Sequence, residues 1–273
     1  MPHDLATFLG PHALIGAVHV AALPATPRSA LPVARIAEQA ASDARAYADA
    51  GLQAVIVENM HDRPYLRGAV GPEIVAAMTL VVAAVRAAVA VPVGLQILAA
   101  ADREAIAVAH AAGAAFVRVE SFVYAHVGDE GLHQSNAAEL LRYRRAIGAD
   151  GVRVFADVKK KHSAHALTAD VDVADIAHAA EFFLVDGVIV TGTATGRPAD
   201  PEDVRRVRAA VHLPVLVGSG IDAHNLASFG DADGYIVGTS LKHDGDWTRP
   251  VDPVRARALA ATRERMLGAT ARA

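Results

Sequence analysis

The stretch "FLVDGVIV" at residues 183–190 decides the fold, because Asp-Gly joins the end of a helical pattern to a short apolar strand. The same unit returns as "DAGLQAVIV" at 49–57 and as "HAAGAAFVRV" at 110–119. A glycine at such a junction suits the left-handed turn that ends many helices. In "VAVPVGL" at 89–95 and "VHLPVLVG" at 211–218 a proline stops the helix instead. Repetition of helix, stop and apolar strand is typical of a parallel sheet with crossover helices.

Outward from these units, the chain contains eight short apolar runs at fairly even spacing. We expect strands at 14–20, 54–59, 93–97, 116–120, 152–158, 187–192, 214–220 and 234–240. Helical periodicity predicts helices at 32–50, 72–88, 102–112, 136–147, 172–183, 200–210, 222–228 and 252–267. Nearly continuous apolar strands are buried on both faces, as parallel strands are. An open doubly wound sheet is the alternative, but no G-x-G-x-x-G follows the first strand. Eight units in 273 residues predict an α/β fold, a single-domain (β/α)8 TIM barrel over 1–273 with its core at about 12–267.

Composition and charge narrow the classes of protein. Hydrophobic residues make up 53% of the chain, which is enough for a large core. The net charge of −4 gives no reason to expect a nucleic acid or an anionic membrane as partner. The absence of cysteine excludes disulfides, thiolate metal sites and cysteine nucleophiles. Because neither a signal-peptide pattern nor an apolar run of membrane-spanning length is present, we expect a soluble, cytoplasmic protein.

The polar residues that follow the strands form the candidate site, since barrels of this kind carry their active sites at the carboxyl ends of the strands. In chain order they are His19, Glu58, Asn59, His61, Gln96, Glu120, Asp157, Lys159, Thr191, Thr193, Ser219, Thr239 and Ser240. Their shared position in the repeat predicts one ring around the barrel mouth. Four of them are candidates for binding the substrate, namely Asn59, Gln96, Thr191 and Thr193.

The last two units predict a phosphate site. The residues concerned are Gly218, Ser219 and Gly220 after the seventh strand, and Gly238, Thr239 and Ser240 after the eighth. Glycine lets the backbone approach an anion closely, and a following helix N-terminus offers free N–H groups. Barrels often bind a substrate phosphate with these two loops. The alternative is that the glycines only make tight turns.

Three carboxylates, Glu58, Glu120 and Asp157, are expected to point into the mouth. Clustered carboxylates repel one another unless a cation or a shared proton relieves them. The cluster therefore predicts a divalent metal such as Mg²⁺, with His19 as a candidate fourth ligand. The alternative is a set of ion pairs with Arg118, Arg153 and the nearby lysines.

The stretch "FADVKKKHS" at 155–163 takes a strand directly into three lysines. Alternation along the strand predicts that Lys159 projects from the same side as Asp157, whereas Lys160 and Lys161 are expected to be solvated. A lysine at the mouth could stabilise an oxyanion, hold a phosphate or carboxylate, or form a Schiff base. Asp157 and Lys159 also resemble the acid–base pairs of phosphosugar barrels.

Two connections are longer than plain turns. These are "NMHDRPYLRGAVGPE" at 59–73 and "SFVYAHVGDEGLHQSN" at 121–136. Loops of this length usually act as lids or contact a ligand, so both are expected to border the site.

Several blocks together resemble one family, the BtpA/SgcQ family. They are "IGAVHVAALPATP", "VENMHDRPY", "RVESFVYAHVGDEGL", "ADVKKKHS", "VTGTATG", "VGSGI" and "GTSLKHDGDW", which occur in order over about residues 10 to 265. The resemblance implies a ribulose-phosphate-binding barrel and supports phosphate binding after the last two strands. One branch of that family is named for photosystem I biogenesis, and another lies in a bacterial gene cluster for phosphosugar metabolism. The resemblance supplies no agreed set of catalytic residues.

These observations predict an enzyme that acts on a phosphorylated small molecule, either a sugar phosphate or a nucleotide-related phosphate. Proton transfer or carbonyl chemistry of the aldolase, epimerase or isomerase type would use Asp157 and Lys159, with His19 as a second acid or base. Glu58 and Glu120 would hold a metal or the substrate hydroxyls. The alternatives are a metal-assisted hydrolase or nucleosidase, or a non-catalytic assembly factor. Because barrels of this group are often homo-oligomers, a homo-oligomer is expected.

Overall fold

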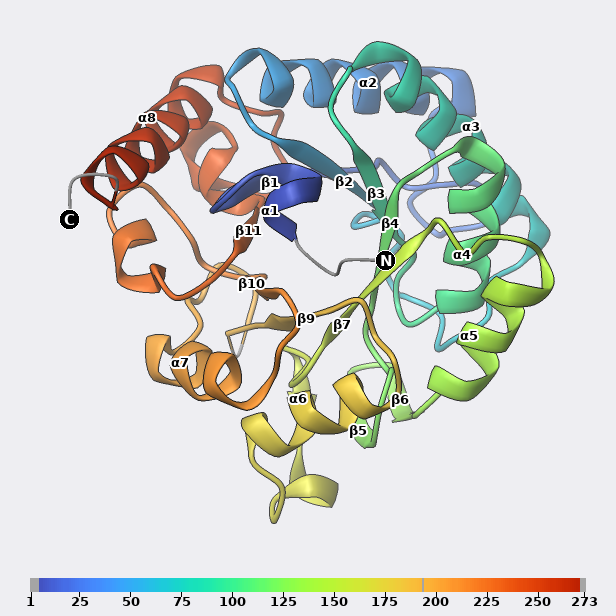
Figure 1. The fold of residues 1–273 in the computed structure, drawn as a ribbon. Helices are drawn as coiled ribbons and strands as arrows, with labels where there is room; N and C mark the ends of the chain where they lie inside the picture. The colour runs from blue at the N-terminus through green and yellow to red at the C-terminus, as the bar shows by residue number, and fades with distance from the viewer. Residues whose placement is uncertain (1–4, 193, 271–273) are drawn as a thin grey trace.

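The computed structural model describes residues 5–192 and 194–270, and it contains the predicted closed barrel of eight parallel strands (Figure 1). The strands are β1 (Ala13–His19), β2 (Ala54–Glu58), β3 (Val93–Gln96), β4 (Phe116–Val119), β7 (Arg153–Asp157), β9 (Gly187–Val190), β10 (Val215–Val217) and β11 (Gly234–Val237). They pair in the order β1-β2-β3-β4-β7-β9-β10-β11, and β11 closes the barrel on β1. The TIM-barrel prediction is confirmed.

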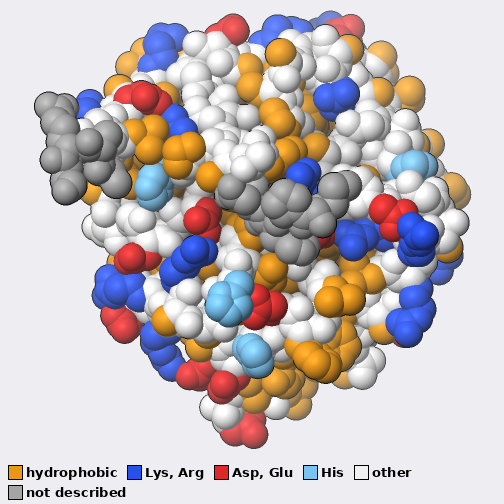
Figure 2. Space-filling model, viewed as in Figure 1, with side chains coloured by type: hydrophobic (Ala, Val, Ile, Leu, Met, Phe, Trp, Pro, Cys, Tyr) orange, Lys and Arg blue, Asp and Glu red, His pale blue; other side chains and the backbone are white. Residues whose placement is uncertain are grey.

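Seven of the eight predicted helices form and surround the barrel (Figure 1). They are α2 (Val33–Asp49), α3 (Pro72–Ala88), α4 (Asp102–Ala112), α5 (Ala137–Ala146), α6 (Val173–Phe182), α7 (Pro201–Ala210) and α8 (Pro253–Thr270). None of the helices in the described part of the chain is long and apolar enough to cross a membrane. On the face drawn in Figure 2, basic and acidic side chains are intermixed and neither sign forms a continuous area.

The helix expected at 222–228 is wrong, since only a short 3-10 helix, η2 (Leu226–Phe229), forms there. The Asp222 carboxylate accepts the N–H groups of His224 and Asn225, and the Asn225 side-chain oxygen accepts the N–H of Asp222. Such bonds between side chains and nearby backbone compete with helical hydrogen bonds. The segment therefore closes into a turn.

Two features lie outside the predicted pattern. A short helix, α1 (Leu5–Leu9), lies across the centre of the barrel in Figure 1 and buries Leu5 and Leu9 against the residues of the barrel interior. The loops after β4 and β7 form a small antiparallel sheet of β5 (Ala125–Gly128), β6 (Gly131–Gln134) and β8 (Ser163–Ala164). The first feature closes the amino-terminal end of the barrel, and the second lies beside its mouth.

Along each strand, side chains point alternately into the barrel and toward the helices outside it. Those that point inward are mainly apolar and fill the interior. Its buried cluster contains Ile15, Ile56, Phe116, Phe155, Ile189, Leu216 and Ile236. A Cβ atom on Gly94 would lie 2.1 Å from the Phe116 ring, so a glycine on β3 makes room for the aromatic side chain on β4. Because side chains alternate along a strand, the next inward residues toward the carboxyl ends are the polar ones. Packing of the interior thus aims the candidate site residues into the mouth.

Candidate functional site

A pocket of about 130 Å³ opens at the carboxyl ends of the strands. It brings together His19, Glu58 and all six residues predicted to bind phosphate. It is lined by Ala17, His19, Glu58, Met60, Arg118, Lys161, Thr195, Gly196, Gly218, Ser219, Gly220, Ile221, Asp222, Ile236, Val237, Gly238, Thr239 and Ser240. Part of the polar ring expected from the repeat therefore lines a cavity.

Arg118 lies at the centre of the charged residues. Its Nε and Nη2 atoms donate to the two Asp157 carboxylate oxygens at 2.9 and 3.0 Å, and its Nη1 lies 3.5 Å from Glu58 Oε1. Burial alone would lower the pKa of the guanidinium, but the Asp157 charge and hydrogen bonds raise it above its usual range. Arg118 therefore stays protonated and neutralises part of the cluster. The sequence carried a signal for it, because Phe116, Arg118 and Glu120 alternate along one strand.

Glu120 has its own partners, separate from those of Asp157. Its Oε2 accepts the N–H of Ala100 at 3.0 Å, and its Oε1 lies 4.0 Å from Lys160 Nζ. Burial raises the pKa of Glu120 to about 6, while the Lys160 charge opposes that shift. The carboxylates thus face different cations, as in the ion-pair alternative.

This arrangement does not fit a divalent metal. Across residues 5–192 and 194–270, no three His, Asp or Glu side chains form a group that could hold a metal ion. The Asp157 oxygens are occupied by Arg118, which also faces Glu58. The magnesium site stays a prediction.

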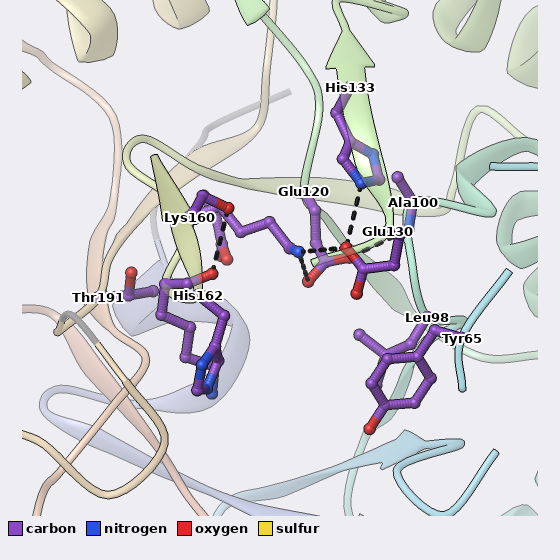
Figure 3. Close-up of polar contacts among 12 residues, drawn as sticks. Tyr65, Leu98, Ala100, Glu120, Glu130, His133, Lys160, His162 and Thr191 are labelled. Atoms are coloured by element: carbon purple, nitrogen blue, oxygen red, sulfur yellow. Dashed lines mark hydrogen bonds and ion pairs between the residues drawn. The ribbon is translucent and has the colours of Figure 1, made fainter. Parts of the chain in front are cut away.

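The lysine segment differs from its expected arrangement. β7 ends at Asp157, so strand alternation no longer governs Lys159, whose carbonyl oxygen accepts the Thr191 hydroxyl at 2.7 Å. Lys161, expected in solvent, is the lysine that lines the pocket. Lys160, also expected in solvent, is only 6% exposed and reaches between Glu120 and Glu130 (Figure 3). The expectation of a solvated side chain is wrong for Lys160, which is buried, whereas Lys161 is half-buried and lines the pocket.

Lys161 carries a perturbed amine. Burial and the Arg118 charge lower the pKa of Lys161, while Glu58, Asp157 and Glu120 act in the opposite direction. A lowered pKa increases the share of neutral, nucleophilic amine near neutral pH. Lys161 can therefore serve as a cation for an anionic group or, when neutral, as a nucleophile or base.

His19 is held as a neutral imidazole. Burial, followed by the Lys242 charge, lowers the pKa of His19 to about 3. Its Nδ1 lies 2.8 Å from the carbonyl oxygen of Trp247, which can only accept, so Nδ1 carries the proton. The Nε2 atom is then an acceptor beside Gly238, where an added Cβ would lie 2.9 Å from it. His19 Nε2 can therefore accept a hydrogen bond from a molecule in the pocket.

The two serine hydroxyls of the glycine loops are already engaged, so these loops offer mainly backbone donors. Ser219 Oγ donates to the carbonyl oxygens of Ala194 and Arg197, and Ser240 Oγ donates to that of Ile221. The N–H groups of four loop residues have no acceptor within the described segments, namely Ser219, Gly220, Thr239 and Ser240. No α-helix starts directly after either loop, so the expected helix-dipole contribution is replaced by these N–H groups.

The predicted substrate-binding residues have mixed positions. Asn59 donates to Asp62 and accepts the N–H of Leu98, so both ends of its amide hold neighbouring loops. Thr191 holds the backbone of the lysine segment. Gln96 is buried at the end of β3, and its Nε2 has no partner among the residues described. Thr193 lies outside the described residues.

The long loop at 121–136 forms the β5–β6 hairpin and connects to the site through one chain of contacts. Glu130 Oε2 lies 3.3 Å from Lys160 Nζ and 3.2 Å from His133 Nε2 (Figure 3). Lys160 in turn faces Glu120. The hairpin is therefore joined to the barrel by buried charges at the edge of the mouth.

The family model described as the BtpA family matches residues 11–265. An uncharacterized mitochondrial protein of Caenorhabditis elegans is 45% identical over 247 residues, which cover 89% of each chain. The photosystem I biogenesis protein BtpA of Synechocystis is 38% identical over 254 residues, or 92% of this chain and 88% of that protein.

Two solved barrels resemble the whole fold at low sequence identity. A thiamine phosphate pyrophosphorylase from Pyrococcus furiosus gives a TM-score of 0.59 at 14% identity and covers 97% of this chain and 100% of its own. The (S)-3-O-geranylgeranylglyceryl phosphate synthase of Thermoplasma acidophilum, in complex with sn-glycerol-1-phosphate, gives 0.59 at 16% identity, with 94% and 95% covered. Similarity at this level shows the fold alone.

Proposed function

The chain belongs to the BtpA family, and we propose that it is an enzyme acting on a phosphorylated small molecule by proton transfer or carbonyl chemistry. The substrate would be a sugar phosphate or a nucleotide-related phosphate. The two similar barrels are both named for phosphate compounds, thiamine phosphate and geranylgeranylglyceryl phosphate, which is consistent with such a substrate.

One observation carries the proposal. The pocket sets the N–H donors of two loops, at 218–220 and 238–240, in the same cavity as Lys161 and His19. A phosphate needs several donors and positive charge, and a proton transfer needs a neutral base within reach of the bound molecule. All of these groups line one cavity at the catalytic end of the barrel.

The residues divide naturally into binding and chemistry. The loop N–H groups would hold the phosphate oxygens, and Arg118 would fix Glu58 and Asp157 in place. His19 Nε2 would accept a hydrogen bond from a substrate hydroxyl, and the neutral Lys161 amine would accept the proton. In the carbonyl route, the neutral Lys161 amine would add to a carbonyl carbon and release water to form an imine. Borohydride reduction in the presence of a candidate substrate would trap that imine as a stable mass increase on Lys161.

The test uses two lysines of one segment as a matched pair. Thermal unfolding is followed with inorganic phosphate, sugar phosphates and nucleotides for the wild type, Lys161→Ala and Lys159→Ala. A ligand at a hundred times its dissociation constant should stabilise the wild type by about 2.7 kcal/mol. The shift should shrink in Lys161→Ala and persist in Lys159→Ala, because Lys159 does not line the pocket. The reverse pattern, or no shift with any phosphate, would contradict the proposal.

A metal-assisted hydrolase or nucleosidase is the nearest enzymatic alternative, and the predicted magnesium belongs to it. It is tested by repeating the unfolding series with Mg²⁺ and with EDTA. A Mg²⁺-dependent shift that disappears in Glu120→Gln would favour this alternative.

A non-catalytic assembly factor is the second candidate, and the similarity to a photosystem I biogenesis protein favours it. Such a factor does not need the pocket. If His19→Asn and Lys161→Ala complement a deletion strain as well as the wild type does, the assembly role is supported over the enzymatic one.

Two finer predictions concern the whole protein. The expected homo-oligomer is tested by light scattering of the purified chain, where a mass near 28.4 kDa would contradict it. The cytoplasmic location is also a prediction, and the printed name of one relative contains the word mitochondrial. Fractionation of cells that express the native protein would locate it.

A further inference from the structure

A second and larger groove lies beside the pocket and shares His19 with it. Its volume is about 530 Å³. The segment after β1, the middle of α2, His61 and residues 248–250 form its walls. His19 is thus a common wall, with the loop donors on one side and this groove on the other.

The groove contains an uncompensated positive charge. Arg28, an exposed side chain, lines it and forms no ion pair with a carboxylate within residues 5–192 and 194–270. The Asp43 carboxylate, also in the groove, is 2.9 Å from Lys242 Nζ and accepts the N–H of Val251. Arg249 shares its charge with Asp244 and Asp246. Because Asp43 is already paired with Lys242, the positive charge of Arg28 is not balanced by a carboxylate that lines the groove.

The wall between the two cavities is held by one tryptophan. The Trp247 ring stacks with His61 at 4.8 Å and lies under the Arg63 guanidinium at 4.7 Å. Its carbonyl oxygen fixes His19 Nδ1. The aromatic surface of Trp247 is therefore already in use, and the groove offers a ligand positive charge rather than a stacking platform.

We propose that the groove binds a second anionic group of the same substrate, so that the substrate carries an anionic group at each end. One phosphate occupies the glycine loops, and the far group reaches Arg28. A molecule that spans the two cavities passes His19, which places its middle carbons beside the neutral imidazole. This inference rests on the proposed function and narrows it to substrates with two separated anionic groups.

The test compares sugar phosphates with and without a second anionic group. Calorimetry measures binding of fructose 6-phosphate, fructose 1,6-bisphosphate and 6-phosphogluconate to the wild type, Arg28→Gln and Arg35→Gln. Arg35 is an exposed α2 residue paired with Glu38, so it controls for the loss of one positive charge. A doubly anionic ligand should bind the wild type at least tenfold more tightly than the monophosphate. Arg28→Gln should lose that preference and keep its affinity for the monophosphate, while Arg35→Gln keeps both.

The outcomes separate the two proposals. Equal affinity for mono- and dianionic ligands, or a preference that survives Arg28→Gln, overturns the second anionic subsite and leaves the proposed function standing. Failure of these sugars, of inorganic phosphate and of the nucleotides in the unfolding series to bind the wild type overturns both.

Discussion

At the scale of single residues, the charge balance at the mouth of the barrel depends on the contacts that Arg118 makes with Asp157 and Glu58. Arg118 is 3% exposed and makes a two-point contact with Asp157 while facing Glu58. Buried carboxylates without a cation would carry a large desolvation penalty. The candidate chemistry around His19 and Lys161 therefore takes place beside a cluster that is already neutralised from within.

Replacing Arg118 tests that cluster. Arg118→Met should lower the free energy of unfolding by about 3 to 5 kcal/mol, because it leaves buried carboxylates without their partner. Urea unfolding measures the change. Arg145→Met is the control, since the Arg145–Asp150 pair is exposed and should contribute less than about 1 kcal/mol. A loss from Arg118→Met no larger than that of the control would show that the cluster is not held by this ion pair.

His19 should make the protein sensitive to acid. Its pKa is lowered to about 3 in the folded state, so between that value and 6.5 the unfolded chain binds more protons than the native protein. Stability is therefore complete above pH 6.5 and falls as the pH drops, by about 2 kcal/mol between pH 6.5 and pH 5. His19→Asn should flatten this part of the pH–stability curve.

The control for the pH series is His178→Asn, on the surface of α6. His178 is largely exposed, so its replacement should leave the slope unchanged. An unchanged slope in His19→Asn would contradict a neutral, buried His19. The measurement is the slope of the urea midpoint against pH, from pH 5 to pH 7, for the wild type and both variants.

At the scale of elements, strand registers and close packing inside the barrel determine which side chains reach the mouth. β3 keeps a glycine where β4 places Phe116, and β9 keeps Gly187 against Phe155 in the same way. The loop elements follow other rules, since the hairpin of β5 and β6 is joined to the barrel through Lys160 and Glu130. The barrel strands thus set the inner polar residues, and the hairpin sets the edge of the mouth.

A methyl group on Gly94 tests the packing between β3 and β4. The new Cβ would lie 2.1 Å from the Phe116 ring, so Gly94→Ala should destabilise the fold by about 1 to 3 kcal/mol or more. Phe116→Leu in the same chain should recover part of the loss. Gly151→Ala is the matched control, because its Cβ would meet nothing within 4 Å. Equal effects of the two alanines on the urea midpoint would count against this packing.

At the scale of the whole molecule, the two ends of the barrel have different tasks. The amino-terminal end is closed by α1, whose Phe8 packs edge-on against Phe116 and lies under the Arg153 guanidinium. The carboxyl end holds the pocket and the groove beside it. Stability and ligand binding should therefore respond separately to changes at the two ends.

Leu9→Ala tests this separation. Leu9 is buried in the interior cluster, so the substitution should cost about 2 to 5 kcal/mol of unfolding free energy. The stabilisation by phosphate should stay as in the wild type, because the pocket lies at the other end. Leu66→Ala, at a side chain that is 55% exposed, is the control and should change stability by less than about 0.5 kcal/mol. Loss of phosphate binding in Leu9→Ala would show that the two ends are coupled.

The sequence by itself determined the barrel, its eight strands, seven of its helices and the loops that line the pocket. It could do so because hydrophobic period and glycine or proline stops are local properties, and because the carboxyl ends of parallel strands share one rim. It also placed His19 and Glu58 correctly at the mouth. The turn at 222–228 was missed because short side-chain bonds outcompeted a helical pattern.

Only the tertiary structure decided which lysine faces the pocket and what neutralises the carboxylates. Alternation predicts side-chain direction only while the chain remains a strand, and β7 ends at Asp157, two residues before Lys159. The pairing of Arg118 with Asp157 joins residues 39 positions apart, and that of Lys242 with Asp43 joins residues 199 apart. The first contact depends on the pairing of β4 with β7, and the second on closure of the barrel between β11 and β1. No local pattern encodes either of these pairings.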